Sequence, residues 1–253
     1  MNRYNFYPSI LDTFNNYLNC SKTYNKFWGN SDEPSKTEEE YEQDCFNQLI
    51  DKINRVPFES EAADKGTAYN ELIDCIIGKR TSDIITIERV NVENKTIAFN
   101  VGYKNNNFYF NYDTAIIIAS SLENSITQQF LEADLTTSKG IVYLYGYSDY
   151  ILPDKCIDLK TTSTQYTAFK FRNNYQHLVY LYCLQKNGFD IELFEYLVLQ
   201  FGNNKPDNIY TEYYNVDFNK ENDLGTLQNI CTQFIDFLET HKHLITDTKI
   251  FNK

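Results

Sequence analysis

Two aspartates and a lysine flank a turn that we predict at Pro153-Asp154. If these two residues form the turn of a β-hairpin, counting outward from it places Asp149 opposite Asp158. Opposed side chains of an antiparallel pair sit roughly 5 Å apart, and like charges at that distance repel each other. Lys160 lies two residues beyond Asp158 and projects from the same face, so its charge can offset that repulsion.

This trio has the chemistry that phosphodiester hydrolysis requires. Two acidic oxygen ligands on rigid strands suit a hard divalent cation, Mg²⁺ or Mn²⁺, which also takes phosphate oxygens. A bound metal lowers the pKa of water, and an ammonium beside it can orient or deprotonate the attacking water or stabilise developing charge. We expect the other face of the hairpin, with Tyr150, Ile157 and Leu159, to be buried.

The same stretch resembles the RecB-like, phage-type exonuclease branch of the PD-(D/E)XK nuclease superfamily. Asp149 stands in the first acidic position, and Asp158-Leu159-Lys160 forms the D-X-K element. A Gln-x-x-x-Tyr pattern follows at Gln176 and Tyr180, as in that branch. The detailed resemblance covers roughly residues 140–200, with a weaker piece near 66–71, and leaves both ends of the chain unmatched.

The resemblance implies an α/β, restriction-endonuclease-like fold, in which a central mixed β-sheet is flanked by helices, and metal-dependent cleavage of DNA. Gln176 and Tyr180 would lie near the active site and the substrate. An upstream helix would supply a third ligand, and residues 66–71 match it. Many relatives carry a metal-binding histidine where Asn70 stands. We choose Glu71 as the third catalytic ligand, beside Asp149 and Asp158, because a carboxylate suits magnesium better than an amide does.

The periodicity of the chain predicts the elements that position these residues. We expect one domain over residues 1–253, made of a helical N-terminal cap (1–62), a nuclease core (63–203) and a C-terminal helical segment (204–253). Within the core, a helix runs from an N-cap at Asp64 to Gly78, an antiparallel meander covers 84–112, and Asp113 caps a short helix. Three strands over 128–162, a helix over 172–187 and a strand over 195–200 follow. The C-terminal helix is expected at roughly 222–242.

The charge balance limits how the chain can hold DNA. The 253 residues include 35 acidic and 23 basic side chains, a net charge of -12, and 42% are hydrophobic. A chain of this length and hydrophobicity can bury a core, so whole-chain disorder is excluded. Extensive phosphate binding needs a basic surface, so any DNA contact must be local. We expect it at a basic strip of Lys155, Lys170 and Arg172, the last two as substrate-binding residues beside Gln176 and Tyr180.

Targeting and cofactor signals are few. The longest apolar run is Ile116-Ile117-Ile118-Ala119, far shorter than a membrane span, and the first residues lack a signal-peptide core, so we expect a cytoplasmic protein without membrane contact. The six cysteines are scattered, with no CxxC pair, which favours buried thiols and no iron-sulfur cluster. No Walker-type loop is present, so any unwinding would need a separate helicase or recombination protein.

Simpler interpretations stay open for several of these residues. Gln176 is nearly as well explained as a solvated amide, and Tyr180 as part of the core. Tyr143, Tyr145 and Tyr147 alternate onto the face of Asp149 and could stack on unpaired bases, but strand propensity explains them equally well. Three function classes follow: a metal-dependent DNA nuclease of recombination, repair or phage DNA metabolism; a nuclease-fold protein that has lost cleavage and binds nucleic acid or a protein; and an unrelated acidic interaction module.

Overall fold

A central mixed sheet of seven strands organises the computed structural model, which describes residues 3–29, 31, 33–93, 95–202, 205–218 and 221–252. Across the sheet the order is β10-β1-β6-β7-β8-β9, and β5 also pairs with β6. β1 runs parallel to β6 and β7 runs parallel to β8, while the other pairs are antiparallel. The strands are β1 (Arg3–Phe6), β5 (Ile126–Thr136), β6 (Ile141–Ile151), β7 (Lys155–Thr162), β8 (Leu193–Gln200), β9 (Asn208–Asn215) and β10 (Phe251–Asn252).

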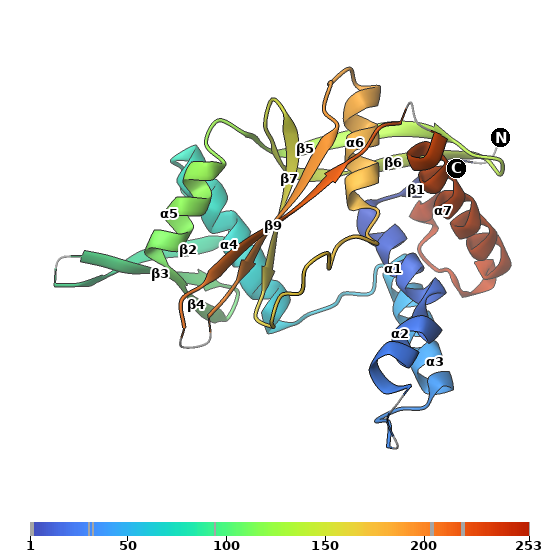
Figure 1. Ribbon diagram of the computed structural model, residues 1–253, viewed down its shortest axis with the longest axis horizontal. Helices are drawn as coiled ribbons and strands as arrows, with labels where there is room; N and C mark the ends of the chain where they lie inside the picture. The colour runs from blue at the N-terminus through green and yellow to red at the C-terminus, as the bar shows by residue number, and fades with distance from the viewer. Residues whose placement is uncertain are drawn as a thin grey trace.

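Helices cover both faces of this sheet, which confirms the predicted fold class (Figure 1). The side chains of β7 and β8 alternate between two buried clusters. Cys156, Phe194 and Tyr196 pack in the cluster that includes α1 (Pro8–Leu18), α6 (Gln176–Lys186) and α7 (Glu221–Thr240). Ile157, Leu159 and Leu197 pack in the other cluster, with α4 (Glu61–Gly78) and α5 (Tyr112–Ser121). Alternation with period two thus gives the sheet two hydrophobic faces.

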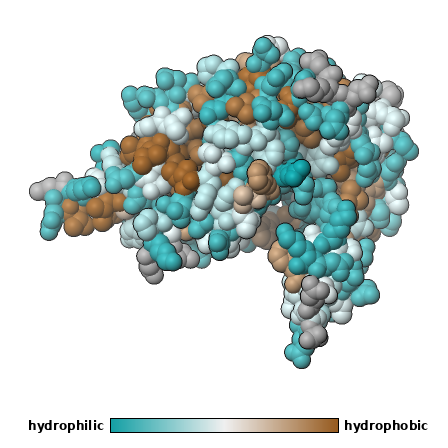
Figure 2. Space-filling model, viewed as in Figure 1, coloured by the Kyte–Doolittle hydropathy of each residue, from teal (hydrophilic) through white to brown (hydrophobic). Residues whose placement is uncertain are grey.

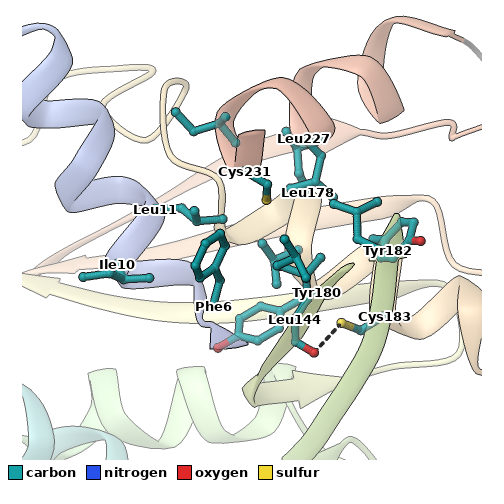
Figure 3. Close-up of a cluster of buried hydrophobic side chains, with 14 of the residues drawn as sticks. Phe6, Ile10, Leu11, Leu144, Leu178, Tyr180, Tyr182, Cys183, Leu227 and Cys231 are labelled. Carbon is teal, nitrogen blue, oxygen red and sulfur yellow. Dashed lines mark hydrogen bonds between the residues drawn. The ribbon is translucent and has the colours of Figure 1, made fainter. Parts of the chain in front are cut away.

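The larger cluster joins the two ends of the chain to the sheet. Figure 3 shows Phe6 and Leu11 from the N-terminal region facing Leu227 and Cys231 of α7, with Leu144 of β6 beneath them. All five side chains are fully buried. Burying large side chains of this kind is worth about 1.5–3 kcal/mol each, so the packing of α1 and α7 stabilises β6.

β6 has three partners on two edges, so the sheet is split beside it. β5 pairs with β6 from Ile141 to Ile151, which fills one edge. On the other edge β1 pairs with residues 141–144 and β7 pairs with residues 150–151. Residues 145–149 lie between these two ladders, at an edge that no described strand covers. Figure 1 accordingly shows β7, β8 and β9 crossing β5 and β6 at a steep angle.

The predicted meander forms a separate three-stranded antiparallel sheet, made of β2 (Ile85–Val92), β3 (Lys95–Tyr103) and β4 (Asn106–Asn111). It packs with α4 and α5 on one face of the main sheet. Figure 2 shows hydrophobic residues on the surface over α5 and this sheet, where Ile87, Ile97 and Ile117 are exposed. The prediction that Asp113 caps α5 is wrong, because the side chain of Asn111 accepts the Thr114 N–H and starts the helix earlier.

The N-terminal cap is helical except at its start. α1, α2 (Cys20–Trp28) and α3 (Glu38–Ile53) form it, and Figure 1 shows α2 and α3 extending away from the sheet. The expected helix over the first residues is wrong, because Arg3–Phe6 forms β1. Tyr4 and Phe6 are buried while Arg3 and Asn5 are half-buried, which is the alternation of a strand.

Three other predicted boundaries change. α4 begins at Glu61 rather than after Asp64, because the Ser60 side chain accepts the Ala63 N–H as the N-cap. α6 begins at Gln176 rather than at residue 172, since residues 168–173 form turns. The C-terminal segment is not wholly helical. β9 precedes α7 in the chain and β10 follows it, and both strands belong to the main sheet.

Within the described ranges no helix has the length and apolar character to cross a membrane. The six cysteines are free thiols, and all but Cys45 are buried, as the scattered spacing predicts.

Candidate active site

The hairpin that carries Asp149 and Asp158 has the predicted register. Tyr150 pairs with Ile157 and Ile151 pairs with Cys156, and the Leu152 N–H donates to the Lys155 carbonyl at 2.8 Å. The next position outward would oppose Asp149 and Asp158, but the described ladder ends before it. The two aspartates therefore stand where β6 and β7 separate.

Asp149 accepts a hydrogen bond from the backbone of β7 at this point. Its Oδ2 accepts the Leu159 N–H at 3.0 Å. The alternation of β6 also breaks here: Ser148 contacts Cys156 in the cluster of α6, whereas Tyr150 faces α4. Regular alternation is therefore interrupted between Ser148 and Tyr150, and the common face of Asp149 and the tyrosines before it stays a prediction.

The face of the hairpin opposite to α6 is buried, as predicted, and it holds a carboxylate that the sequence did not single out. Tyr150, Ile157 and Leu159 are all buried against α4. The Tyr150 hydroxyl donates to Asp74 of α4 at 2.8 Å, and burial raises the pKa of Asp74. The sequence signal for this residue is an acidic side chain between the apolar neighbours Ile73 and Cys75.

Charge is concentrated in the site itself. The Asp158 side chain is 4% exposed, and burial together with the neighbouring Asp158 raises the pKa of Asp149. Lys160 Nζ lies 2.6 Å from Asp158 Oδ2. Burial alone would lower the pKa of Lys160, but the carboxylates of Asp158, Asp149 and Asp12 raise it, so the ammonium stays charged.

Gln176, the first residue of α6, links the aspartate to the lysine. Its amide nitrogen donates to Asp158 Oδ1, and its carbonyl oxygen accepts from Lys160 Nζ at 2.9 Å. The simpler interpretation of a solvated amide does not fit these contacts. Gln176 therefore contacts the predicted catalytic residues directly, and it can hold both in place.

Asp12 of α1 anchors the start of α6, and the sequence did not single it out either. Its Oδ1 accepts the Tyr175 N–H at 2.5 Å, so it serves as an N-cap from another helix. Burial raises the pKa of Asp12 to about 6. Asp12 lies between Leu11 and Phe14, which are buried, and a charge next to such residues was the available signal.

Tyr180 covers part of the open edge of β6. Its hydroxyl donates to the Tyr147 carbonyl at 2.6 Å, in the gap between the β1 and β7 ladders. Gly146 permits this approach, because a Cβ there would lie 2.9 Å from the Tyr180 ring. The Tyr180 hydroxyl is therefore engaged by the fold, whereas its predicted role was substrate binding.

The upstream helix brings Asn70, not Glu71, toward the site. Asn70 Nδ2 lies 3.5 Å from the Leu159 carbonyl, and its Oδ1 is buried without a hydrogen-bond partner. Glu71 forms two bonds with Arg80, at 2.7 and 3.1 Å, and this guanidinium lowers the pKa of Glu71. Glu71 of α4 is thus held in an ion pair with Arg80. No described contact joins Glu71 to Asp149, Asp158 or Lys160.

One residue of the predicted basic strip is paired with a carboxylate. Lys155 pairs with the buried Glu195 at 2.6 Å, so it is not free to bind phosphate. Lys170 and Arg172 are exposed in the turns between β7 and α6, and no contact that the structure describes joins either to Asp149, Asp158 or Lys160. Their assignment to substrate binding stays a prediction.

The donor set fits a hard cation in part. Asp149 and Asp158 supply two carboxylates, and the unpartnered Asn70 Oδ1 and the Leu159 carbonyl are further oxygen donors on the same strand junction. Among the described residues no group of three or more His, Cys, Asp or Glu side chains gathers as a metal site. A cation here would thus use two carboxylates with neutral oxygens and water.

Comparisons with known proteins give structural likeness only. No protein-family model and no curated protein matches the chain. A crystal structure of a protein named SSO0001 is similar at a TM-score of 0.46 and 12% identity, covering 92% of this chain and 76% of its own. A crystal structure from Eubacterium rectale named "Putative exonuclease" is similar at a TM-score of 0.44 and 14% identity, covering 92% and 85%. These values do not establish a family or an activity for this chain.

Proposed function

We propose that this protein is a divalent-metal-dependent deoxyribonuclease that hydrolyses phosphodiester bonds, with Asp149, Asp158 and Lys160 as its catalytic residues. The observation that carries the proposal is the junction of β6 and β7. There, two carboxylates and an ammonium meet where the strands separate, and Asp158 is almost fully buried. Burying these charges lowers folding stability, which a surface ion pair does not do. Charges that are kept despite such a loss are typical of catalytic sites.

Asp149 and Asp158 would hold Mg²⁺ or Mn²⁺, which supplies Lewis-acid activation of the phosphate and lowers the pKa of water. Lys160 provides the positive charge that the scissile phosphate needs as negative charge develops on its oxygens. Gln176 fixes the orientation of Lys160 and Asp158 through its two amide atoms. The low exposure of Asp158 limits competing water around these charges.

We propose that the substrate is DNA. More specifically, we propose that the protein is an exonuclease of recombination, repair or phage DNA metabolism. The acidic chain, with a net charge of -12, requires that recognition be local to the site. Gln176 lies in that site, and Lys170 and Arg172 lie on the segment that leads into α6. A separate helicase or recombination protein is the partner that we propose for unwinding.

The test is cleavage of end-labelled linear and closed circular DNA in magnesium, manganese or calcium, by the wild type and by Asp158→Asn. We expect release of nucleotides from linear DNA in magnesium or manganese, and at least a hundredfold slower release by the variant. Cleavage of circular DNA would instead indicate an endonuclease. Equal activity of the two proteins would remove Asp158 from the mechanism.

A second function is favoured by the small donor set, since the described residues supply only two clustered carboxylates to the site. In this alternative the protein keeps the fold but binds nucleic acid or a protein partner without cleavage. DNA binding in calcium, combined with intact DNA after incubation with magnesium and manganese, would support it over the nuclease.

A further inference from the structure

A groove of about 750 Å³ lies at the open edge of β6, next to the catalytic residues. Gln176 forms part of its wall, and the same side chain bonds Asp158 and Lys160. Tyr180 lines it as well. The Gln176 side chain therefore lies between the groove and the proposed catalytic residues.

The walls of this groove are largely aromatic and partly open to water. Tyr147 is 61% exposed and Phe130 of β5 is 38% exposed, and their ring centroids lie 5.1 Å apart. Tyr143 and Tyr145 stack at 5.6 Å farther along the same strand. Exposed rings gathered in a concave surface are typical of a binding site rather than of a core.

Cations are scarce along these walls. Arg55 is the cation among the residues that line the groove, and its guanidinium also pairs with Asp247 at 2.9 Å and donates to the Tyr145 hydroxyl at 3.1 Å. Neutralisation of many phosphates cannot supply the affinity here. Stacking on aromatic rings can, because each stacked base contributes without any need for a protein charge.

We infer that this groove holds the unpaired bases of a single-stranded DNA end, while the strand's backbone reaches Asp149 and Asp158. The bases of a duplex are already stacked and paired, so they offer no free face to Tyr147 or Phe130. A flexible strand can also turn a phosphate toward Asp158, which is 4% exposed, more easily than a rigid duplex can. The inference rests on the proposed function and specifies its substrate.

Binding of fluorescent oligonucleotides in calcium tests this assignment independently of cleavage. The probes are a short oligothymidylate, an abasic oligodeoxynucleotide of the same length, and a blunt duplex. We expect the wild type to bind oligothymidylate about tenfold or more tightly than either other probe, since neither the abasic strand nor the duplex offers free bases to stack on the rings. Equal affinity for the abasic strand would overturn the inference, because that probe keeps the phosphates and lacks the bases.

The matched variants are a Tyr147→Leu, Phe130→Leu double substitution and the control Tyr109→Leu. Tyr109 is 67% exposed and lies on β4 of the other sheet. We expect the double variant to bind oligothymidylate about tenfold more weakly, with an unchanged melting temperature, and the control to bind as the wild type does. Unchanged affinity of a folded double variant would overturn the inference.

The two proposals fail separately. If the wild type binds no oligonucleotide in calcium, the base-binding assignment is wrong and the aromatic surface is better explained by a protein partner. The proposed hydrolysis is judged by magnesium-dependent cleavage alone. A wild type that binds single strands but never cleaves them would retain the groove assignment and contradict the nuclease.

Discussion

The carboxylate of Asp149 accepts the backbone N–H of Leu159 at 3.0 Å, just beyond the last described pair of the β6–β7 ladder. A side chain thereby takes the acceptor position that a strand carbonyl would otherwise fill. This substitution lets the strands separate without leaving a buried N–H unpaired. The separation creates room between β6 and β7 for the charged groups of the site.

Asp158→Asn should abolish cleavage without unfolding the protein. The substitution relieves the repulsion with Asp149 but also weakens the buried ion pair with Lys160. Because these two effects oppose each other, the free energy of unfolding in chelator should stay close to that of the wild type. Chemical denaturation and a nuclease assay measure the two effects. Asp154→Asn, in the exposed hairpin turn, is the control and should keep full activity.

Gln176→Ala should lower kcat about 10–100-fold with little change in melting temperature, because it removes the group that orients Lys160 and Asp158. Steady-state kinetics on single-stranded DNA measure this loss. Gln233→Ala, at an exposed position of α7, is the control. A kcat equal to that of the wild type would show that Gln176 does not orient Lys160 and Asp158 for catalysis.

The contacts of α4 favour Asn70 over Glu71 as the third metal ligand. Glu71→Gln should cost stability of about 1 kcal/mol or less through loss of the Arg80 pair, and Arg80→Gln should cost the same. Neither should alter the magnesium concentration that supports half-maximal cleavage. Asn70→His, in contrast, should lower that concentration, because Asn70 is the residue that approaches Leu159. A raised magnesium requirement in Glu71→Gln alone would restore Glu71 as the ligand.

Magnesium or manganese should raise the melting temperature of the wild type. An ion that binds only the folded state adds about 2.7 kcal/mol when its free concentration is roughly 100 times Kd. Thermal denaturation with and without the ion measures this shift. An Asp149→Ala, Asp158→Ala double variant should show none, and an equal shift in that variant would place the ion elsewhere.

Asp12 should make the stability of the wild type fall as pH rises. Because its pKa is raised to about 6 on folding, the folded state binds more protons than the unfolded state between about pH 4 and that value, and stability is lost through this window. Asp12→Asn keeps an acceptor for Tyr175 but cannot titrate. Its stability relative to the wild type should therefore rise by on the order of 2 kcal/mol across the window.

Urea denaturation in chelator at several pH values measures this difference. His177, whose burial lowers its pKa to about 4, contributes to both proteins, so subtraction isolates Asp12. Parallel stability curves would mean that Asp12 titrates normally.

The register of the β6–β7 hairpin followed from the sequence by itself. A two-residue turn determines which residues oppose each other, so Pro153-Asp154 was enough to align Tyr150 with Ile157 and to bring Asp149 and Asp158 to adjacent positions. The meander over 84–112 and the mixed α/β class followed in the same way, from alternation and turn residues close together in the chain.

Tertiary structure decided the surroundings of that hairpin. The split edge of β6 depends on β1, whose partners lie far along the chain, and the anchor of α6 depends on Asp12, 163 residues before Tyr175. The choice between Asn70 and Glu71 likewise depends on where Arg80 and Leu159 lie in space. Local patterns specify neighbours a few residues apart, whereas these contacts form only when separate elements pack against one another, because burial selects the partners.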